Sequence, residues 1–360
     1  MHWLTHPWLL ALGILVLLLL AAWAHLAFWV RRYAVPARYA EEARIATPDG
    51  SAIELRRLPP PPTPSLPPIL MVHGLAANHR NVDTEPDRSL ARHLHAEERD
   101  VWLLTLRSGR ADRRRAERSR IRFAAMVEHD LPLAIEHVLS RTGAEAVDYV
   151  GFSMGGMLMY AALGRTVAEA RVRRAVIIGS PGRIDLPFRV LRIFRWMPRL
   201  FVPSLWLRLG ARMTAFLVEA LPLPLEHFIF NRANVARGAV ARALVNIIED
   251  IPGSLQADFN EWAFSDGVIR VDGEPVLEGL ATVEVPALFF AGAKDRIASP
   301  AAVRAAFDAW GREGTEVEKE WRLLARAEGA AEDYGHGDLA IGEHLPADLF
   351  GPAALFLGQA

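Results

Sequence analysis

The 360-residue sequence predicts an α/β fold with a mostly parallel central sheet and helices on both faces. Short, continuously apolar runs alternate with helical stretches, which is typical of strands buried on both sides. The clearest runs are residues 101–106, 175–179 and 287–291. Another run, residues 147–150, leads into a turn that carries a serine between glycines. Such sheets place their active sites at the carboxyl ends of the strands, where this turn is expected.

Composition narrows the class of protein further. Hydrophobic residues make up 51% of the chain, which is enough for one large core with an insertion. The net charge of −1 provides no overall field that would attract nucleic acid, and no nucleic-acid partner is expected. The absence of cysteine excludes disulfides, thiolate metal sites and a cysteine nucleophile. We expect neither a metal site nor another cofactor.

The N-terminal segment predicts a transmembrane helix. Residues 8–30 contain no Asp, Glu, Lys or Arg, and 23 residues are long enough to cross the roughly 30 Å hydrocarbon core of a bilayer. Trp3, Trp8 and Trp29 flank the run, as aromatic residues do at membrane interfaces. We therefore predict a single-pass membrane anchor over residues 1–32.

The alternative is a cleaved signal peptide, with Ala22-Trp23-Ala24 as the processing site. The anchor is favoured because no Lys or Arg precedes the apolar run, which continues beyond Ala24. Arg31, Arg32 and Arg38 follow the run, so the positive-inside bias predicts a catalytic body on the cytoplasmic side. An exported body is the alternative orientation.

The first part of the core is expected over residues 39–180. Residues 43–47 and 51–58 flank a Pro-Asp-Gly turn and predict a β-hairpin. The proline-rich residues 59–68 predict a stiff surface connection to a strand at 69–72. The second part of the core is expected over residues 273–360. The remaining expected elements are helices over residues 123–141, 154–163 and 301–310 and a last strand over residues 317–324.

Residues 181–272 break the alternation and predict a helical cap inserted between two strands of the sheet. Residues 183–212 combine many aromatic side chains with seven arginines and a single acid, Asp185. We expect the apolar side chains to pack over the active-site cleft, with the arginines in solvent. The alternative is a face that lies on lipid headgroups. Residues 107–122 hold eight further arginines and are expected to form a solvated loop.

The serine turn reads Gly151-Phe152-Ser153-Met154-Gly155-Gly156. A serine between a strand and a helix, in the pattern G-x-S-x-G, is the nucleophile elbow, in which Gly151 and Gly155 permit a very tight turn. We therefore predict Ser153 as a nucleophile. The simpler interpretation is that the glycines only mark a turn from strand to helix.

A serine hydroxyl needs a base within hydrogen-bond reach, and the base needs an orienting carboxylate. In this arrangement the chain order is serine, acid, histidine. Asp295 follows the strand at 287–291 through a short loop and is the predicted acid. Asp272 and Glu274 are weaker rivals because no clear strand precedes them. His336, in a glycine-containing loop after the last strand, is the predicted base, and His344 is its rival.

The oxyanion that forms during acyl transfer needs two preorganised N–H donors. The Met154 amide directly follows the nucleophile, and the Leu75 amide lies in the loop after the strand at 69–72. These two amides form the predicted oxyanion hole. His73 is a candidate brace for that loop, while Asn78 and His79 are near enough in sequence to touch substrate.

Four stretches together resemble the α/β-hydrolase superfamily: residues 73–75, the elbow at Ser153, residues 292–295 and residues 334–336. The resemblance covers residues 43–358. It is closest to the acid-lipase and polyhydroxyalkanoate-synthase-like branch. The synthases use a cysteine nucleophile, whereas this chain has Ser153 and no cysteine, so the resemblance implies hydrolysis.

The resemblance implies a serine hydrolase of the esterase or lipase type. It would cleave carboxylic esters through an acyl-enzyme on Ser153, without a cofactor, and its substrate would be a small-molecule or lipid ester. Two alternatives remain at this stage. One is an acyltransferase on the same fold, and the other is a non-catalytic protein that uses the fold to bind a ligand.

Overall fold

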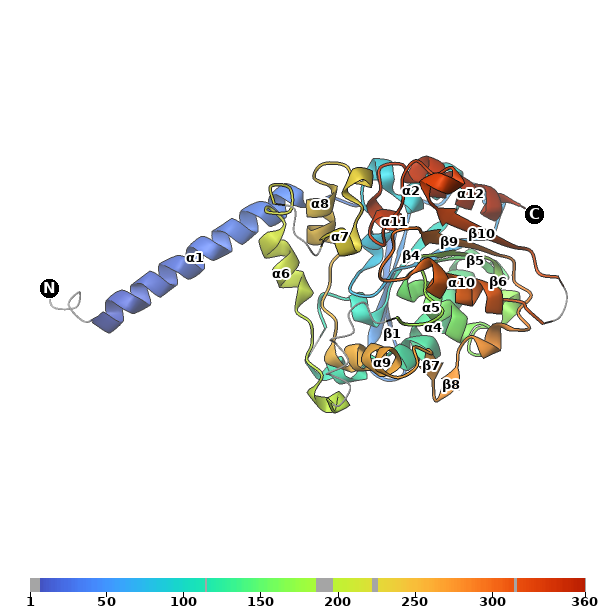
Figure 1. Ribbon diagram of the computed structural model, residues 1–360, viewed down its shortest axis with the longest axis horizontal. Helices are drawn as coiled ribbons and strands as arrows, with labels where there is room; N and C mark the ends of the chain where they lie inside the picture. The colour runs from blue at the N-terminus through green and yellow to red at the C-terminus, as the bar shows by residue number, and fades with distance from the viewer. Residues whose placement is uncertain (1–6, 114, 186–196, 222–225, 314–315, 360) are drawn as a thin grey trace.

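The computed structural model describes residues 7–113, 115–185, 197–221, 226–313 and 316–359. An eight-stranded sheet lies at the centre of the body, in the order β1-β2-β4-β3-β5-β6-β9-β10 (Figure 1). The pairs β1–β2 and β2–β4 are antiparallel and all other neighbours are parallel. The predicted α/β class with a mostly parallel sheet is therefore confirmed. The strands are β1 Glu41–Ala46, β2 Ala52–Arg57, β3 Ile69–Val72, β4 Val101–Thr105, β5 Val147–Phe152, β6 Val172–Ile178, β9 Ala287–Gly292 and β10 Lys319–Leu324.

Alternate residues of the inner strands enter two separate apolar cores. In β3, Leu70 and Val72 pack into one core, whereas Ile69 and Met71 pack into the other. Successive side chains of a strand point to opposite faces, so continuously apolar strands need helices on both sides. The first core is covered by α4 Leu131–Thr142, α5 Met154–Ala162 and α10 Pro300–Ala309, and the second by α2 Leu90–Ala96, α11 Asp338–Ile341 and α12 Gly351–Gly358 (Figure 1).

The helix expected over residues 123–141 is present but is interrupted. It consists of α3 Phe123–Ala125, a π-helical turn over Met126–Asp130, and α4. Pro132 has no N–H to donate to the carbonyl of Glu128, which favours the wider turn. Gly143 then ends α4 with a left-handed conformation, φ 72°.

A helical insertion separates β6 from β9. It contains α6 Leu207–Thr214, α7 Glu226–Ile229, α8 Ala239–Asn246 and α9 Gly253–Phe264, followed by a short hairpin of β7 Arg270–Val271 and β8 Glu274–Pro275. Its position agrees with the predicted cap, whose limits at residues 181 and 272 stay a prediction. Much of the predicted aromatic stretch, residues 186–196, lies outside the described residues.

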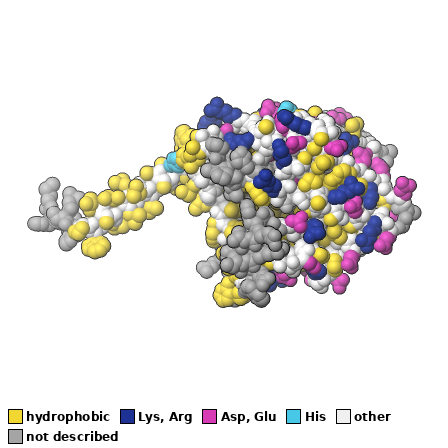
Figure 2. Space-filling model, in the orientation of Figure 1, with side chains coloured by type: hydrophobic (Ala, Val, Ile, Leu, Met, Phe, Trp, Pro, Cys, Tyr) yellow, Lys and Arg dark blue, Asp and Glu magenta, His cyan; other side chains and the backbone are white. Residues whose placement is uncertain are grey.

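Helix α1, Pro7–Tyr33, projects from the body (Figure 1). None of its residues is buried, and its side chains are almost all apolar (Figure 2). Within the described part of the chain, α1 is the one helix whose length and composition suit a membrane span. The predicted N-terminal apolar helix is therefore present.

The expectation of a solvated loop over residues 107–122 is wrong for two of its arginines. Arg107 and Arg110 are fully buried. Arg107 contacts the carboxylates of Asp49 and Asp130, with an Nη2–Oδ1 distance of 2.7 Å to Asp130. Arg110 pairs with Glu117 at 3.0 Å. The carboxylates that hold Arg107 are remote in sequence, so only the tertiary fold brings them to it.

The Arg107→Ala substitution should strongly destabilise the fold. Asp130 is completely buried, and burial raises its pKa to about 6 even with Arg107 beside it. Removing one partner of a buried pair leaves an uncompensated charge and costs about 3–5 kcal/mol. Urea unfolding of detergent-solubilised protein measures this loss of stability.

Arg141→Ala is the matched control. Arg141 pairs with Glu41 at 2.9 Å on the surface, so its loss should cost below about 1 kcal/mol. Equal stability of the two variants would show that the buried pair contributes no more than the exposed one.

Candidate active site

The turn after β5 has the strained geometry of a nucleophile elbow. Ser153 adopts φ 52° and ψ −115°, in a region that residues with side chains rarely occupy. A Cβ atom on Gly155 would lie 2.4 Å from the carbonyl oxygen of Val72, and one on Gly151 would lie 2.6 Å from the amide nitrogen of Gly156. Glycine is therefore required at both predicted positions, because no side chain fits there.

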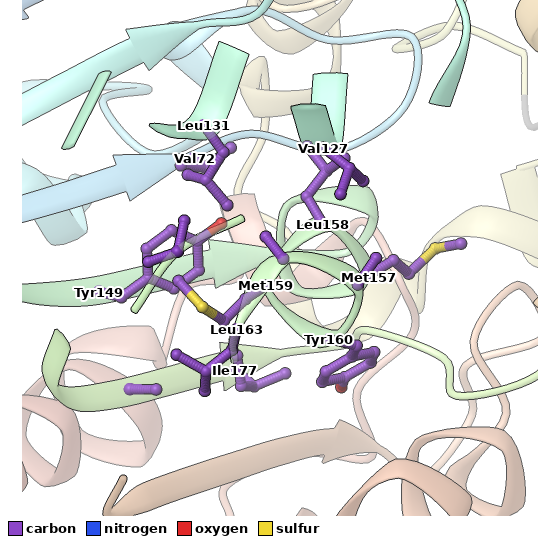
Figure 3. Close-up of a cluster of buried hydrophobic side chains, with 14 of the residues drawn as sticks. Val72, Val127, Leu131, Tyr149, Met157, Leu158, Met159, Tyr160, Leu163 and Ile177 are labelled. Atoms are coloured by element: carbon purple, nitrogen blue, oxygen red, sulfur yellow. The ribbon is translucent and has the colours of Figure 1, made fainter. Parts of the chain in front are cut away.

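Packing of α5 holds this strained turn in place. Every residue of α5 is buried, and Figure 3 shows its side chains enclosed by residues from the neighbouring strands and helices. Tyr149, in β5, donates a 2.6 Å hydrogen bond to the carbonyl of Gly155, and Tyr160 donates one of 2.9 Å to Ser180. The helix that follows Ser153 therefore cannot turn or slide without breaking the core.

The structure brings Ser153, His336 and Asp295 together. His336 Nε2 lies 3.1 Å from Ser153 Oγ, and His336 Nδ1 lies 2.7 Å from Asp295 Oδ2. With Nδ1–H donating to the carboxylate, Nε2 is free to accept the serine proton. All three residues are buried, with 8%, 9% and 4% exposure for Ser153, His336 and Asp295.

Asp295 follows β9 as expected. Its second oxygen, Oδ1, accepts hydrogen bonds from the amides of Ile297 at 2.8 Å and Ala298 at 2.7 Å. These bonds fix the carboxylate with its other oxygen toward His336.

The rival residues lie elsewhere. Asp272 sits in the turn between β7 and β8 and pairs with Arg165 at 2.5 Å. Glu274 is exposed in β8, and His344 is exposed beyond α11. The structure therefore places Asp295 and His336, rather than these rivals, beside Ser153.

The two predicted oxyanion donors flank the nucleophile. Met154 is the first residue of α5, and its amide has no acceptor among the described residues; the same holds for the Leu75 amide. The loop that carries Leu75 touches the serine, since a Cβ atom on Gly74 would lie 3.0 Å from Ser153 Cβ. Two unpaired N–H groups beside a serine suit the stabilisation of negative charge on a carbonyl oxygen.

Two buried side chains hold this loop. His73 accepts a hydrogen bond from the Leu106 amide at Nε2, 3.1 Å, and therefore carries its proton on Nδ1, which donates to the Gly74 carbonyl at 2.8 Å. Burial lowers the pKa of His73 to about 4, so the ring is neutral at physiological pH. Asn81 Oδ1 accepts a 3.0 Å hydrogen bond from the Gly74 amide. The predicted brace at His73 is present, whereas the contribution of Asn81 has no signal in the sequence.

Comparison with known proteins identifies the family. A family model described as the alpha/beta hydrolase fold matches residues 67–336, more than half of the chain. The chain belongs to the α/β-hydrolase fold family. The predicted superfamily is thus confirmed, while the finer branch stays a prediction.

Several lipases and esterases are similar to this α/β hydrolase. Human gastric triacylglycerol lipase is 30% identical over 173 residues, which cover 44% of either chain. Human lipase member M is 32% identical over 128 residues, covering 32% of this chain and 30% of the relative. The alignments thus span less than half the length of these curated relatives. They support ester hydrolysis in general as the chemistry of this chain.

Solved structures agree in fold. An esterase from Thermogutta terrifontis superposes with a TM-score of 0.55 at 17% identity, over 88% of this chain and 98% of the other. A membrane phospholipase A, described as a bacterial virulence factor, superposes with a TM-score of 0.54 at 17% identity, over 97% of each chain. At this level of identity the similarity concerns the fold alone.

Asn78 and His79 of this α/β hydrolase contact the insertion and β4. Asn78 Nδ2 donates to the Asn246 carbonyl and to Glu249, both at 3.1 Å. His79 lies 2.9 Å from Thr105 Oγ1. Both side chains are thus engaged with the insertion and β4, and an approach of either to the substrate stays a prediction.

A further buried carboxylate joins the histidine loop to the insertion. Asp338 accepts hydrogen bonds from the amides of Gly335 at 3.0 Å and Asn231 at 2.9 Å, and Gly337 donates to the Ile229 carbonyl at 2.9 Å. Burial raises the pKa of Asp338 to about 6. Sequence patterns do not reveal this link, because Asn231 lies more than a hundred residues from Asp338 in the chain.

The Asn81→Ala substitution should slow ester hydrolysis. It leaves the buried Gly74 amide without an acceptor and loosens the loop that carries the Leu75 amide. We expect kcat to fall about tenfold, equivalent to ~1.4 kcal/mol, with a smaller change in KM. Steady-state kinetics on a p-nitrophenyl ester measure both constants.

Asn78→Ala provides the control, since this side chain lies three positions earlier and points to the insertion. Its kcat should stay within about twofold of the parent value, because its hydrogen bonds go to Asn246, Glu249 and the Arg80 amide and none reaches Gly74. A larger loss of kcat for Asn78→Ala than for Asn81→Ala would contradict the proposed support of the oxyanion loop.

Proposed function

We propose that this chain is a membrane-anchored serine hydrolase that cleaves carboxylic esters with apolar acyl groups through an acyl-enzyme on Ser153. The observation that carries the proposal is the hydrogen-bonded chain from Ser153 Oγ through His336 to Asp295. Serine, histidine and aspartate in this geometry form a catalytic triad, in which the histidine activates the weakly nucleophilic serine hydroxyl.

The contact between His336 Nε2 and Ser153 Oγ supports the proposed acylation step. In this step, Nε2 takes the proton of Ser153 as Oγ bonds to the ester carbonyl carbon. The carbonyl oxygen becomes an oxyanion, which the amides of Leu75 and Met154 stabilise. The C–O bond to the alcohol then breaks, and His336 returns the proton to the leaving oxygen.

Deacylation repeats these roles with water. His336 takes a proton from water, the hydroxide bonds to the acyl carbon, and the bond to Ser153 Oγ breaks as Oγ recovers its proton. Asp295 holds the imidazole in the required tautomer in both halves of the reaction. The carboxylic acid leaves and the serine is regenerated.

Two observations support an apolar ester as substrate. Human gastric triacylglycerol lipase, one of the relatives, acts on triacylglycerol by its name. Helix α1 suits a membrane anchor and would hold the catalytic body next to lipid esters.

Ser153→Ala should abolish hydrolysis of p-nitrophenyl esters, because the nucleophile is lost. Losing a triad member removes about 10⁴–10⁶-fold of kcat in well-characterised serine hydrolases. The parent enzyme should prefer long acyl chains to acetate. Both expectations are measured by initial rates on a series of acyl lengths with detergent-solubilised protein.

The matched control is Ser140→Ala, an exposed serine on α4, which should leave the rates unchanged. Retention of activity in Ser153→Ala would refute the nucleophile assignment. A preference for acetate would refute the lipid substrate while leaving the serine mechanism intact.

The anchor makes a separate prediction. Full-length protein should remain in the membrane pellet after extraction with alkaline carbonate, because a span of this length stays in the bilayer. The chain has no cysteine, so Ile297→Cys places a single label on the body, at a side chain that is 41% exposed. The predicted cytoplasmic body should escape a membrane-impermeant maleimide in intact cells and react after lysis.

Release of the protein into the carbonate supernatant would refute the anchor. Labelling of Ile297→Cys in intact cells would instead place the body on the outer side of the membrane.

A further inference from the structure

Exposed apolar side chains gather in two parts of the molecule. Among the described residues, every large apolar side chain that is strongly exposed belongs to α1 or to residues 201–221, except Ile297 and Leu355. Scattered exposed apolar residues are normal on soluble proteins, but a concentrated set marks an interaction surface. In the second group these are Phe201, Leu205, Trp206, Leu207, Leu209, Met213 and Leu221.

Helix α6 exposes apolar side chains, whereas a helix on the surface of a soluble protein exposes polar ones. Trp206, just before the helix, lies on one face with Leu209 and Met213, since these positions are three and four residues apart. Their exposures are 59%, 55% and 48%. Arg208 and Arg212, four residues apart, are only partly exposed and contact the body of the protein. The apolar face of α6 therefore points outward and its cations point inward.

The inward arginines are held by the protein. Arg212 donates from Nε and Nη2 to the Val245 carbonyl at 3.3 and 3.2 Å. Arg208 Nε lies 3.6 Å from Glu249, and its backbone amide donates to Asp250 at 2.9 Å. These contacts fix the rotation of α6, so the outward apolar face cannot be exchanged for the charged one.

The exposed face lies beside the end of α1. Phe216, two residues beyond α6, stacks on Trp29 with ring centroids 5.5 Å apart and contacts His25 edge-on at 4.6 Å. Asn246 binds the chain that leaves α1, accepting from the Val35 amide at 3.0 Å and donating to the Tyr33 carbonyl at 2.9 Å. Helix α1 is thus fixed to the insertion rather than hinged freely.

For the proposed span, this contact would be at the level of the membrane interface. It involves the last turns of the apolar span, where Trp29 precedes Arg31 and Arg32, and Trp and Arg at the end of a span lie among the lipid headgroups. Helix α6 runs crosswise to α1, on the side of the body from which α1 projects (Figure 1). Figure 2 shows apolar side chains along α1 and again on this side of the body.

We propose that the outward face of α6, formed by Trp206, Leu209 and Met213, lies in the headgroup region of the bilayer that α1 spans. The inference rests on the proposed role of α1 as an anchor. An amphipathic helix in the membrane plane buries its apolar face about 5–10 Å into the boundary between headgroups and acyl chains. The crosswise orientation, the fixed contact with α1 and the inward arginines all suit this arrangement.

The arrangement would place the insertion between the bilayer and the catalytic loops. The same insertion supplies Asn231 and Ile229, which bond to the loop of His336 through Asp338 and Gly337. The insertion would then contact lipid on one side and the loop of His336 on the other. This arrangement would suit an enzyme that takes its ester directly from the membrane.

Single cysteines test the proposal, since the parent chain has none. Leu209→Cys and Met213→Cys report on α6, Leu17→Cys reports on α1, and Leu355→Cys on α12 is the matched control, an exposed leucine remote from the insertion. Full-length protein carries an environment-sensitive fluorophore at each position. It is reconstituted in phosphatidylcholine vesicles with or without lipids spin-labelled near the headgroup or near the chain end.

We expect the labels at positions 209 and 213 to be quenched by the shallow spin label at least about twofold more than the label at 355, as an interfacial depth requires. The label at 17 should be quenched by the deep spin label. Hydrolysis of a soluble ester by each variant verifies that the labelled proteins are folded.

Each of the remaining outcomes would contradict one specific part of the proposal. Quenching at 209 and 213 no greater than at 355 refutes lipid contact by α6. Protection of these labels from aqueous iodide without quenching by lipid would mean that a second protein copy covers the face. Absence of quenching at 17 would refute the anchor itself, on which the inference about α6 rests, and would leave the proposed serine mechanism intact.

Discussion

The tight packing around Ser153 is the constraint on which the rest of the site depends. The serine backbone is strained, and it is held because Gly155 lies against the carbonyl of Val72 and α5 is buried along its whole length. β3 and β5 are neighbours in the sheet, with Val72 opposite Gly151. The contact that stabilises the turn therefore also brings the loop with the predicted oxyanion donor, which continues β3, next to Ser153.

The acid and the base depend on a second close contact between neighbouring strand ends. A Cβ atom on Gly292 would lie 2.5 Å from the carbonyl of Tyr334, and the backbone amide of Lys294 donates to the same carbonyl at 2.8 Å. The loops after β9 and β10 are thereby locked together, which sets the 2.7 Å contact between Asp295 and His336. Parallel strands make this possible because their carboxyl ends meet at one edge of the sheet.

Arginine is used inside this protein as well as on its surface. Arg107 is buried against Asp130, and Arg208 and Arg212 turn toward the body while apolar side chains of α6 face outward. The guanidinium group tolerates burial when carboxylates or carbonyls satisfy its donors. Composition alone predicted arginines exposed to solvent, because composition does not specify which carboxylates the fold brings near each arginine.

The sequence by itself determined the class of the sheet, the positions of its strands, and the residues Ser153, Asp295 and His336 as the best candidates for one site. Each of these follows from local patterns: apolar runs, glycine spacing and position after a strand. Only the tertiary structure decided that Asn81 supports the oxyanion loop, that Asp338 joins the histidine loop to the insertion, and that α6 presents its apolar face outward. These features depend on contacts between residues far apart in the chain, and hydrophobic periodicity does not specify which face of a helix meets the protein and which meets its surroundings.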